Sequence, residues 1–236
     1  MSGPEETEST ALLERAIGYA LCSVRTVTPG LLTRATPCRG WDLHRLLRHT
    51  NDSLAALHEG IDAGSVDLAP AEEPYGDPAE AFRTRASRLL GTWSALHAPG
   101  PDGDCAGERL VAVGDWPLTA AIVARTGALE IAVHGWDIAQ ATGLPRPIPP
   151  ALATELLRTA RHLVPEPRYR QPLFALPVEA PPYADPSDRL VAFLGRDPAA
   201  PHGRAGGNGS AHGGTGGPGT GPGTGGSGSG SGSGGT

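Results

Sequence analysis

Residues 118–142 form a long, nearly uninterrupted apolar segment with helical spacing, and the segment is followed by Gly143. Its only formally charged residues are Arg125, Glu130 and Asp137. A helix that is apolar on nearly all sides is stable only when other elements surround it. The segment therefore predicts a central helix in a mainly α chain, with further helices packed around it.

Other segments supply helices for this packing. Apolar residues recur at helical spacing over residues 10–27, 43–61, 78–97 and 150–163, and a last short helix is expected over 189–194. Asp42 is a good cap for the second of these helices. A strand is indicated only weakly, over 109–113, and residues 65–78 are expected to be a loop. The pattern predicts a bundle of four long helices with short extra helices.

Glycine is concentrated at one end of the chain. Half of the 34 glycines lie in residues 205–236, a stretch without any charged residue and with the composition of a flexible coil. The expected organisation is a flexible N-terminus over 1–9, one helical domain over 10–201, and a disordered Gly/Ser-rich tail over 202–236. The domain is long enough to bury a single core.

Charge and composition exclude several classes of function. The chain has 19 basic residues, all arginine, against 25 acidic ones, and this balance argues against nucleic-acid binding. No apolar run is long enough to span a membrane, and the acidic N-terminus does not resemble a signal peptide. The three cysteines form neither a CxxC pair nor a disulfide framework. We expect a cytoplasmic protein without a membrane or nucleic-acid partner.

Three polar residues of the central segment share one face of the predicted helix. At 100° per residue, Glu130, His134 and Asp137 span about 60° of arc. Burying a carboxylate without a partner costs several kcal/mol, and a divalent metal ion is one way to neutralise it. Asp137 could then hold the other ring nitrogen of His134. The alternative is a hydrogen-bonded Glu–His pair without a metal.

A metal site here needs a ligand from another helix. Residues 43–61 offer His44, His49 and His58, and their spacing does not distinguish among them. Cys38 is interpreted as a small packed residue rather than a nucleophile, and Trp41 as a structural residue.

Some arginines are candidates for holding an anionic substrate. They are Arg39, Arg45, Arg48 and Arg125, and the alternative for each is a solvated or ion-paired side chain. Arg196 is expected to take part in a C-terminal cap against the bundle.

Three separated motifs resemble those of one family. TPCRGWDLHRLLRH at residues 36–49 and EIAVHGWDIAQATG at 130–143 resemble "TPC-x-GW-[ST]-x-x-x-L-x-x-H" and "E-x-x-x-HGWDLA-x-ATG" of the actinobacterial mycothiol-dependent maleylpyruvate isomerase family. That family belongs to a superfamily of DinB-like metal-binding four-helix bundles. DRLVAFLGRDP at 188–198 resembles the C-terminal motif of short-form, uncharacterised metal-binding relatives.

The resemblance implies a metal site made by His49, Glu130 and His134. Two imidazoles and one carboxylate leave coordination positions open, as in catalytic zinc sites. Zinc is the expected ion, with nickel and iron as the alternatives. Asp137, Arg39 and Arg125 are candidates for supporting the ligands or facing the substrate. No further catalytic residue is assigned.

The resemblance also implies a chemistry. With a divalent ion the site carries a net charge of +1 and favours a thiolate, so mycothiol would attack a small electrophilic substrate in a transferase or isomerase reaction. The alternatives are a non-catalytic metal- or small-ligand-binding module on the same fold, and a structural protein with a buried Glu–His pair. No second domain like that of the characterised isomerase is expected.

Overall fold

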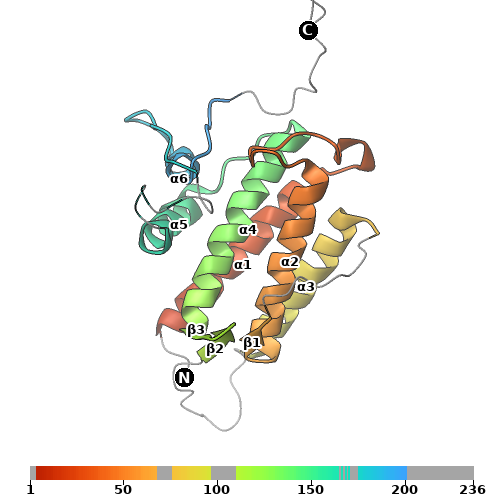
Figure 1. Ribbon diagram of the computed structural model, residues 1–236, viewed down its shortest axis with the longest axis vertical. Helices are drawn as coiled ribbons and strands as arrows, with labels where there is room; N and C mark the ends of the chain where they lie inside the picture. The colour runs from red at the N-terminus through yellow and green to blue at the C-terminus, as the bar shows by residue number, and fades with distance from the viewer. Residues whose placement is uncertain are drawn as a thin grey trace, which may run out of the picture. The chain divides into compact units, whose positions relative to one another are not determined.

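Helix α4 (Ala120–Thr142) runs through the middle of the molecule, with other helices on both sides of it (Figure 1). The computed structural model describes residues 4–67, 76–96, 110–164, 166, 168, 170 and 175–200. Nearly every residue of α4 from Gly127 onward is buried. Gly143 ends the helix in the left-handed conformation (φ 77°), which glycine adopts without strain. The predicted central helix is therefore present.

Three long helices complete a four-helix bundle with α4, as predicted: α1 (Pro4–Val24), α2 (Leu43–Asp62) and α3 (Pro78–Leu96). Shorter helices connect or follow them: η1 (Pro29–Leu31), α5 (Pro150–Leu163) and α6 (Pro186–Phe193). Helix α1 makes the most extensive contact with α4, and α2 packs against both α3 and α4. Helices α5 and α6 lie together beside the bundle (Figure 1).

Local signals set several helix boundaries. The carboxylate of Asp42 accepts a hydrogen bond of 2.8 Å from the backbone nitrogen of Arg45, so it caps α2 as predicted. Pro150 and Pro186 are the first residues of α5 and α6. A backbone N–H at this position has no partner within the helix, so proline, which lacks the N–H, loses no hydrogen bond there. These boundaries follow from residues within one turn of each helix end.

Helix α1 differs from its predicted range, because it begins at Pro4 and ends at Val24 instead of covering 10–27. The expected flexible N-terminus is therefore corrected for residues 4–9, which are helical. Ser9 and Thr10 are buried, and Glu8 lies 3.7 Å from Arg125 of α4. Contacts with the rest of the fold thus extend the helix beyond its apolar stripe.

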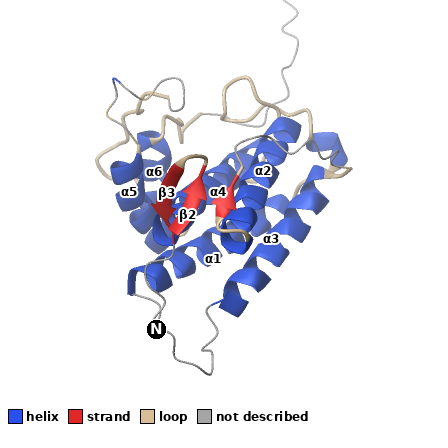
Figure 2. Cartoon of the chain, turned by 60° about the horizontal axis from the view of Figure 1, so that its bottom comes forward, coloured by secondary structure: helices blue, strands red, loops and turns tan. Residues whose placement is uncertain are grey.

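A small sheet crosses one end of the bundle (Figure 2). Its strands are β1 (Ser65–Val66), β2 (Leu110–Val113) and β3 (Trp116–Thr119), with β1 parallel and β3 antiparallel to β2. The predicted strand is present as β2, whereas β1 lies in a segment that is expected to be loop. Strand β1 has only two residues, and it pairs with a segment distant in the sequence. No local pattern predicts such a pairing.

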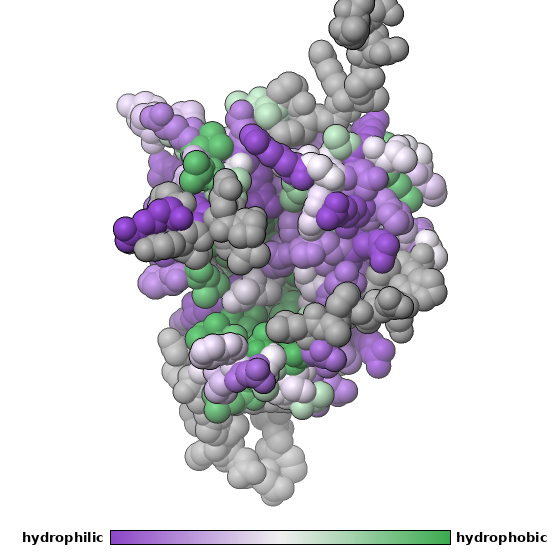
Figure 3. All heavy atoms as spheres, in the orientation of Figure 1, coloured by the Kyte–Doolittle hydropathy of each residue, from purple (hydrophilic) through white to green (hydrophobic). Residues whose placement is uncertain are grey.

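The described residues up to Ala200 belong to one compact unit. The predicted tail over 202–236 lies outside the described residues. No helix in the described part of the chain is both long and apolar enough to cross a membrane. On the face drawn in Figure 3, hydrophilic residues cover most of the area over α2, and hydrophobic ones gather near the strands.

Small residues let α4 approach its neighbours closely. A Cβ atom added at Gly135 would lie 3.0 Å from both the Cα and the Cβ of Ala20 on α1. A Cβ added at Gly127 would meet the side chain of Leu57 on α2 at 2.5 Å. The glycines therefore permit the helix spacing on two sides of α4.

We predict that Gly135→Val lowers the free energy of unfolding by about 1–3 kcal/mol, because the new side chain overlaps the backbone of α1. Gly18→Val is the matched control, since Gly18 is an exposed position on α1 with nothing within 4 Å of an added Cβ. Denaturant unfolding of both variants measures the difference. Equal stability of the two variants would contradict the close helix crossing.

Candidate metal centre

Two helices bring three potential ligands together. The Nε2 atom of His49 on α2 lies 2.6 Å from Oε1 of Glu130 on α4, and Nε2 of His134 lies 3.1 Å from the same oxygen. The candidate ligand atoms of these residues all lie within 4.8 Å of one another. The structure thus assembles the set that the family resemblance implied.

The tertiary structure distinguishes among the three histidines of α2. His49 faces Glu130, whereas the Nε2 atom of His58 lies 3.4 Å from the hydroxyl of Thr92 on α3. His44 lines a neighbouring surface hollow. Only the packing of α2 against α4 decides which histidine meets the Glu130–His134 pair.

The geometry of these three residues suits a divalent cation. Two ligand atoms on a tetrahedral zinc ion, at bond lengths of about 2.0 Å, lie about 3.3 Å apart. The separation of 3.1 Å between His134 and Glu130 is close to that value, whereas the 2.6 Å between His49 and Glu130 is a hydrogen-bond distance that a bound ion would widen. His49 and Glu130 keep 39% and 37% of their side-chain surface exposed, which leaves access for additional ligands.

Asp137 orients one of the three candidate ligands. Its Oδ2 atom lies 3.0 Å from Nδ1 of His134, and its side chain is fully buried. A carboxylate at this nitrogen favours the tautomer with the proton on Nδ1, which leaves the lone pair of Nε2 facing Glu130. The shared helical face of these residues predicts this contact as one role for Asp137.

Two partners of Asp137 were missed by the sequence analysis. Arg196 donates from Nε to Oδ1 at 3.3 Å and from Nη2 to Oδ2 at 2.8 Å, and the Sγ atom of Cys38 donates to Oδ2 at 3.2 Å. Arg196 had been assigned to a C-terminal cap and Cys38 to simple packing. A carboxylate on an apolar helix signals the need for a cation, but it does not indicate where in the chain that cation lies.

Cys38, His134 and Asp137 form a second cluster of potential ligand atoms. A metal ion there would lie beside the guanidinium of Arg196, which is 2.8 Å from Asp137 and 3.5 Å from Cys38. Two cations side by side in a buried site repel each other strongly. This cluster is therefore a hydrogen-bonded network, and the set with His49 is the better cation site.

The charges of the site are strongly coupled. Burial alone would raise the pKa of Glu130, but the charge of His134 and hydrogen bonds with both histidines hold that pKa well below its ordinary value. Burial alone would lower the pKa of His134, yet Glu130 and the hydrogen bond to Asp137 raise it well above its ordinary value. The carboxylate of Glu130 thus requires a positive charge beside it, from a proton or from a metal ion.

Asp137 is held in its ionised form. Burial would raise its pKa, but the charge of Arg196 and hydrogen bonds from His134 and Arg196 hold the pKa of Asp137 well below its usual range. An ionised Asp137 is a hydrogen-bond acceptor only, so it can accept from Nδ1 of His134.

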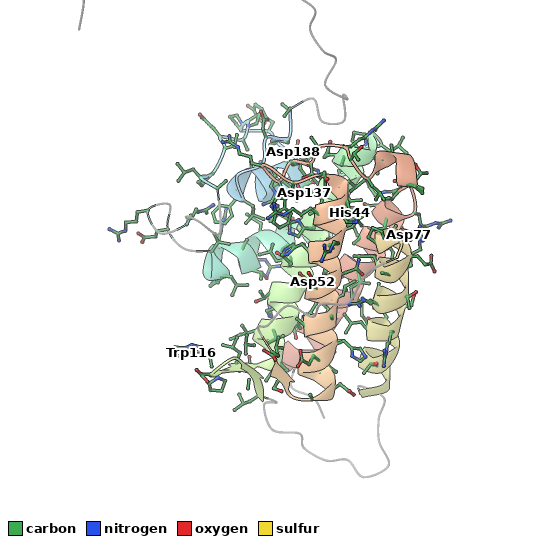
Figure 4. The ribbon with its side chains drawn as sticks, turned by 45° about the vertical axis from the view of Figure 1, so that its right-hand side comes forward. His44, Asp52, Asp77, Trp116, Asp137 and Asp188 are labelled. Carbon is green, nitrogen blue, oxygen red and sulfur yellow. The ribbon has the colours of Figure 1, made fainter. Side chains whose placement is uncertain are left out.

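A hollow of about 860 Å³ adjoins the candidate ligands, and His49 lines it. The ring of Trp41 lies 4.9 Å from that of His49, and the guanidinium of Arg45 stacks over Trp41 at 4.8 Å. His44 and Asp52 on α2 also line this hollow, and both are labelled in Figure 4, together with Asp137. Trp41, expected to be structural, therefore also forms the wall of the hollow beside a candidate ligand.

The arginines of this hollow are only partly those proposed from the sequence. Arg45 and Arg48 line it, whereas Arg39 is exposed and does not. Arg125 lies in a separate hollow that α1, α4 and α5 form, 3.7 Å from Glu8. The structure therefore does not bring Arg39 or Arg125 to the candidate ligands.

Comparisons with known proteins agree with the motifs. The family model described as "Mycothiol maleylpyruvate isomerase N-terminal domain" matches residues 14–139. Two uncharacterized proteins, from two strains of Mycobacterium tuberculosis, are each 32% identical over 163 residues, which is 68% of this chain and 82% of theirs. No solved structure matches. Because the family model and these relatives match, the chain belongs to the family of the mycothiol maleylpyruvate isomerase N-terminal domain.

Proposed function

We propose that the protein binds a divalent metal ion through His49, Glu130 and His134, and that it uses the ion to activate a thiol for transfer or isomerisation. The observation that carries this proposal is the convergence of two imidazoles and one carboxylate within 4.8 Å. The family name points to mycothiol as the thiol. Zinc suits this donor set, in which protein ligands leave at least one position open.

The proposed chemistry needs a thiol in its ionised form. His49, Glu130 and His134 would hold a divalent cation, and its positive charge would favour the ionised form of a thiol at neutral pH. The two histidines are neutral as ligands and Glu130 contributes one negative charge, so the site keeps a net positive charge that favours an anion. The thiol proton would pass to solvent, and the sulfur would form a bond to an electrophilic carbon of a small substrate. Elimination of the same thiolate after rotation about the substrate's carbon–carbon bond would give an isomer, whereas protonation of the adduct or departure of a leaving group would complete a transfer.

Residues around the proposed ligands serve binding and orientation. Asp137 fixes the ring of His134, and the ring of Trp41 lies against His49. Arg45 and Arg48 line the adjoining hollow and would attract anionic groups of a thiol or substrate. The hollow leads to the partly exposed side chain of His49, where the two reactants would meet.

We predict that the purified protein binds about one equivalent of zinc, and that His49→Ala, Glu130→Gln and His134→Ala each weaken binding. Loss of a ligand should exceed the roughly 10–100-fold reduction that follows loss of an outer hydrogen-bond partner. Metal content after dialysis and competition with a chromophoric chelator measure the effect.

His58→Ala is the matched control for metal binding, because His58 lies on the same helix but contacts Thr92 instead of Glu130. It should retain wild-type zinc affinity. Circular dichroism of the metal-free variants checks that each is folded. The assignment fails if the three ligand variants bind zinc as well as His58→Ala does.

We further predict that mycothiol stabilises the zinc-loaded protein. A ligand at 100 times its Kd adds about 2.7 kcal/mol to the stability of the native state, which corresponds to a rise of about 5–10 °C in the unfolding midpoint of a domain of this size. Thermal scans with and without mycothiol measure the shift.

Two controls test whether the thiol group itself is bound. S-methylated mycothiol cannot form a thiolate, and the metal-free protein has no cation to stabilise one, so neither combination should give the full shift. Equal shifts in all combinations, or no shift with mycothiol, would contradict thiol activation. Metal binding without a thiol effect would instead indicate a non-catalytic binding module.

A further inference from the structure

We propose that Arg196 is a positioning residue of the metal centre, and that it acts on His134 through Asp137. This inference rests on the proposed function, because it assumes that His134 is a metal ligand. It adds a residue that lies beyond residues 14–139, the part of the chain that the family model matches.

Arg196 fixes the plane of the Asp137 carboxylate. It donates to both oxygens, from Nε to Oδ1 at 3.3 Å and from Nη2 to Oδ2 at 2.8 Å. Such a two-point contact sets the orientation of a carboxylate as well as its position, which a single hydrogen bond cannot do. Asp137 is fully buried, so no solvent competes for these oxygens.

The oriented carboxylate in turn fixes the ring of His134. Oδ2 lies 3.0 Å from Nδ1, and the opposite ring nitrogen, Nε2, lies 3.1 Å from Glu130. A rotation of the carboxylate would move the acceptor away from Nδ1 and release the ring. Partners of this kind set the tautomer and the direction of a ligating histidine.

Arg196 itself is held by the C-terminal segment. Its backbone nitrogen donates to the carbonyl of Val191 at 2.9 Å, and Nη1 donates to the carbonyl of Leu194 at 3.2 Å. Gly195 has a positive φ of 84°, and a Cβ there would lie 2.5 Å from the Cβ of Ala175. The turn after α6 therefore places the guanidinium, so this segment completes the support of a site whose proposed ligands lie on α2 and α4.

Zinc affinity of substituted proteins tests the inference. Arg196→Gln removes the charge and should weaken zinc binding on the order of 10-fold, within the range for outer partners of ligands. Arg196→Lys keeps the charge but makes one contact, so its affinity should lie between those of Arg196→Gln and wild type. Arg189→Gln is the matched control, since Arg189 is exposed on α6 and donates to the carbonyl of Pro182. It should bind zinc like wild type.

A spectroscopic readout separates positioning from a general loss of stability. The visible absorption bands of the cobalt-substituted protein report ligand geometry, and they should shift in Arg196→Gln but not in Arg189→Gln. Unfolding of the metal-free proteins measures stability separately. If Arg196→Gln does not fold, Arg196→Lys carries the same comparison.

A double-mutant cycle tests the route through Asp137. If Arg196 acts through that carboxylate, adding Arg196→Gln to Asp137→Asn should cause little further loss of zinc affinity. Additive losses would overturn the inference, as would wild-type affinity and an unchanged cobalt spectrum in Arg196→Gln. Either of these two outcomes would overturn the role of Arg196 and leave the proposed function intact. A wild-type protein that binds no metal would refute both the role of Arg196 and the proposed function.

Discussion

The rest of the site depends on the hydrogen bonds that the buried carboxylate of Asp137 accepts. An unpaired carboxylate in an apolar core costs several kcal/mol, so its oxygens must be matched by donors. The structure supplies them from three places: Cys38 before α2, His134 on α4 and Arg196 after α6. Because these residues are far apart in the sequence, the network closes only when the C-terminal segment is docked on the bundle.

Two carboxylates on the same face of α4 have different surroundings. Asp137 is fully buried and is held in place by a guanidinium, whereas Glu130 keeps 37% of its side-chain surface exposed, and its ion pairs within the described part of the chain are with His49 and His134. The first carboxylate is already neutralised by the protein. The second depends on a proton or a metal ion for its partner. This difference makes Glu130 a candidate ligand and Asp137 the support of the neighbouring candidate ligand, His134.

The family match and the geometry of the site concern the same residues: the match covers the candidate ligands, and the geometry brings them together. The matched residues 14–139 include His49, Glu130, His134 and Asp137, but the similar mycobacterial proteins are uncharacterized. We therefore infer metal binding from the donor set and its surroundings, whereas the thiol is suggested by the family name. The hollow beside His49, with Trp41 and two arginines in its wall, is the site at which the proposed function places the substrate.

The sequence alone determined the central helix, its end at Gly143, the cap at Asp42 and the shared face of Glu130, His134 and Asp137. Each of these depends on residues within a few turns of one another, and helical periodicity is a local property. The family motifs added His49, which spacing could not separate from its neighbours. Only the tertiary structure placed Arg196 and Cys38 against Asp137, added β1, and extended α1 to Pro4. Those features arise from contacts between distant segments, which are stable only when the whole core has formed.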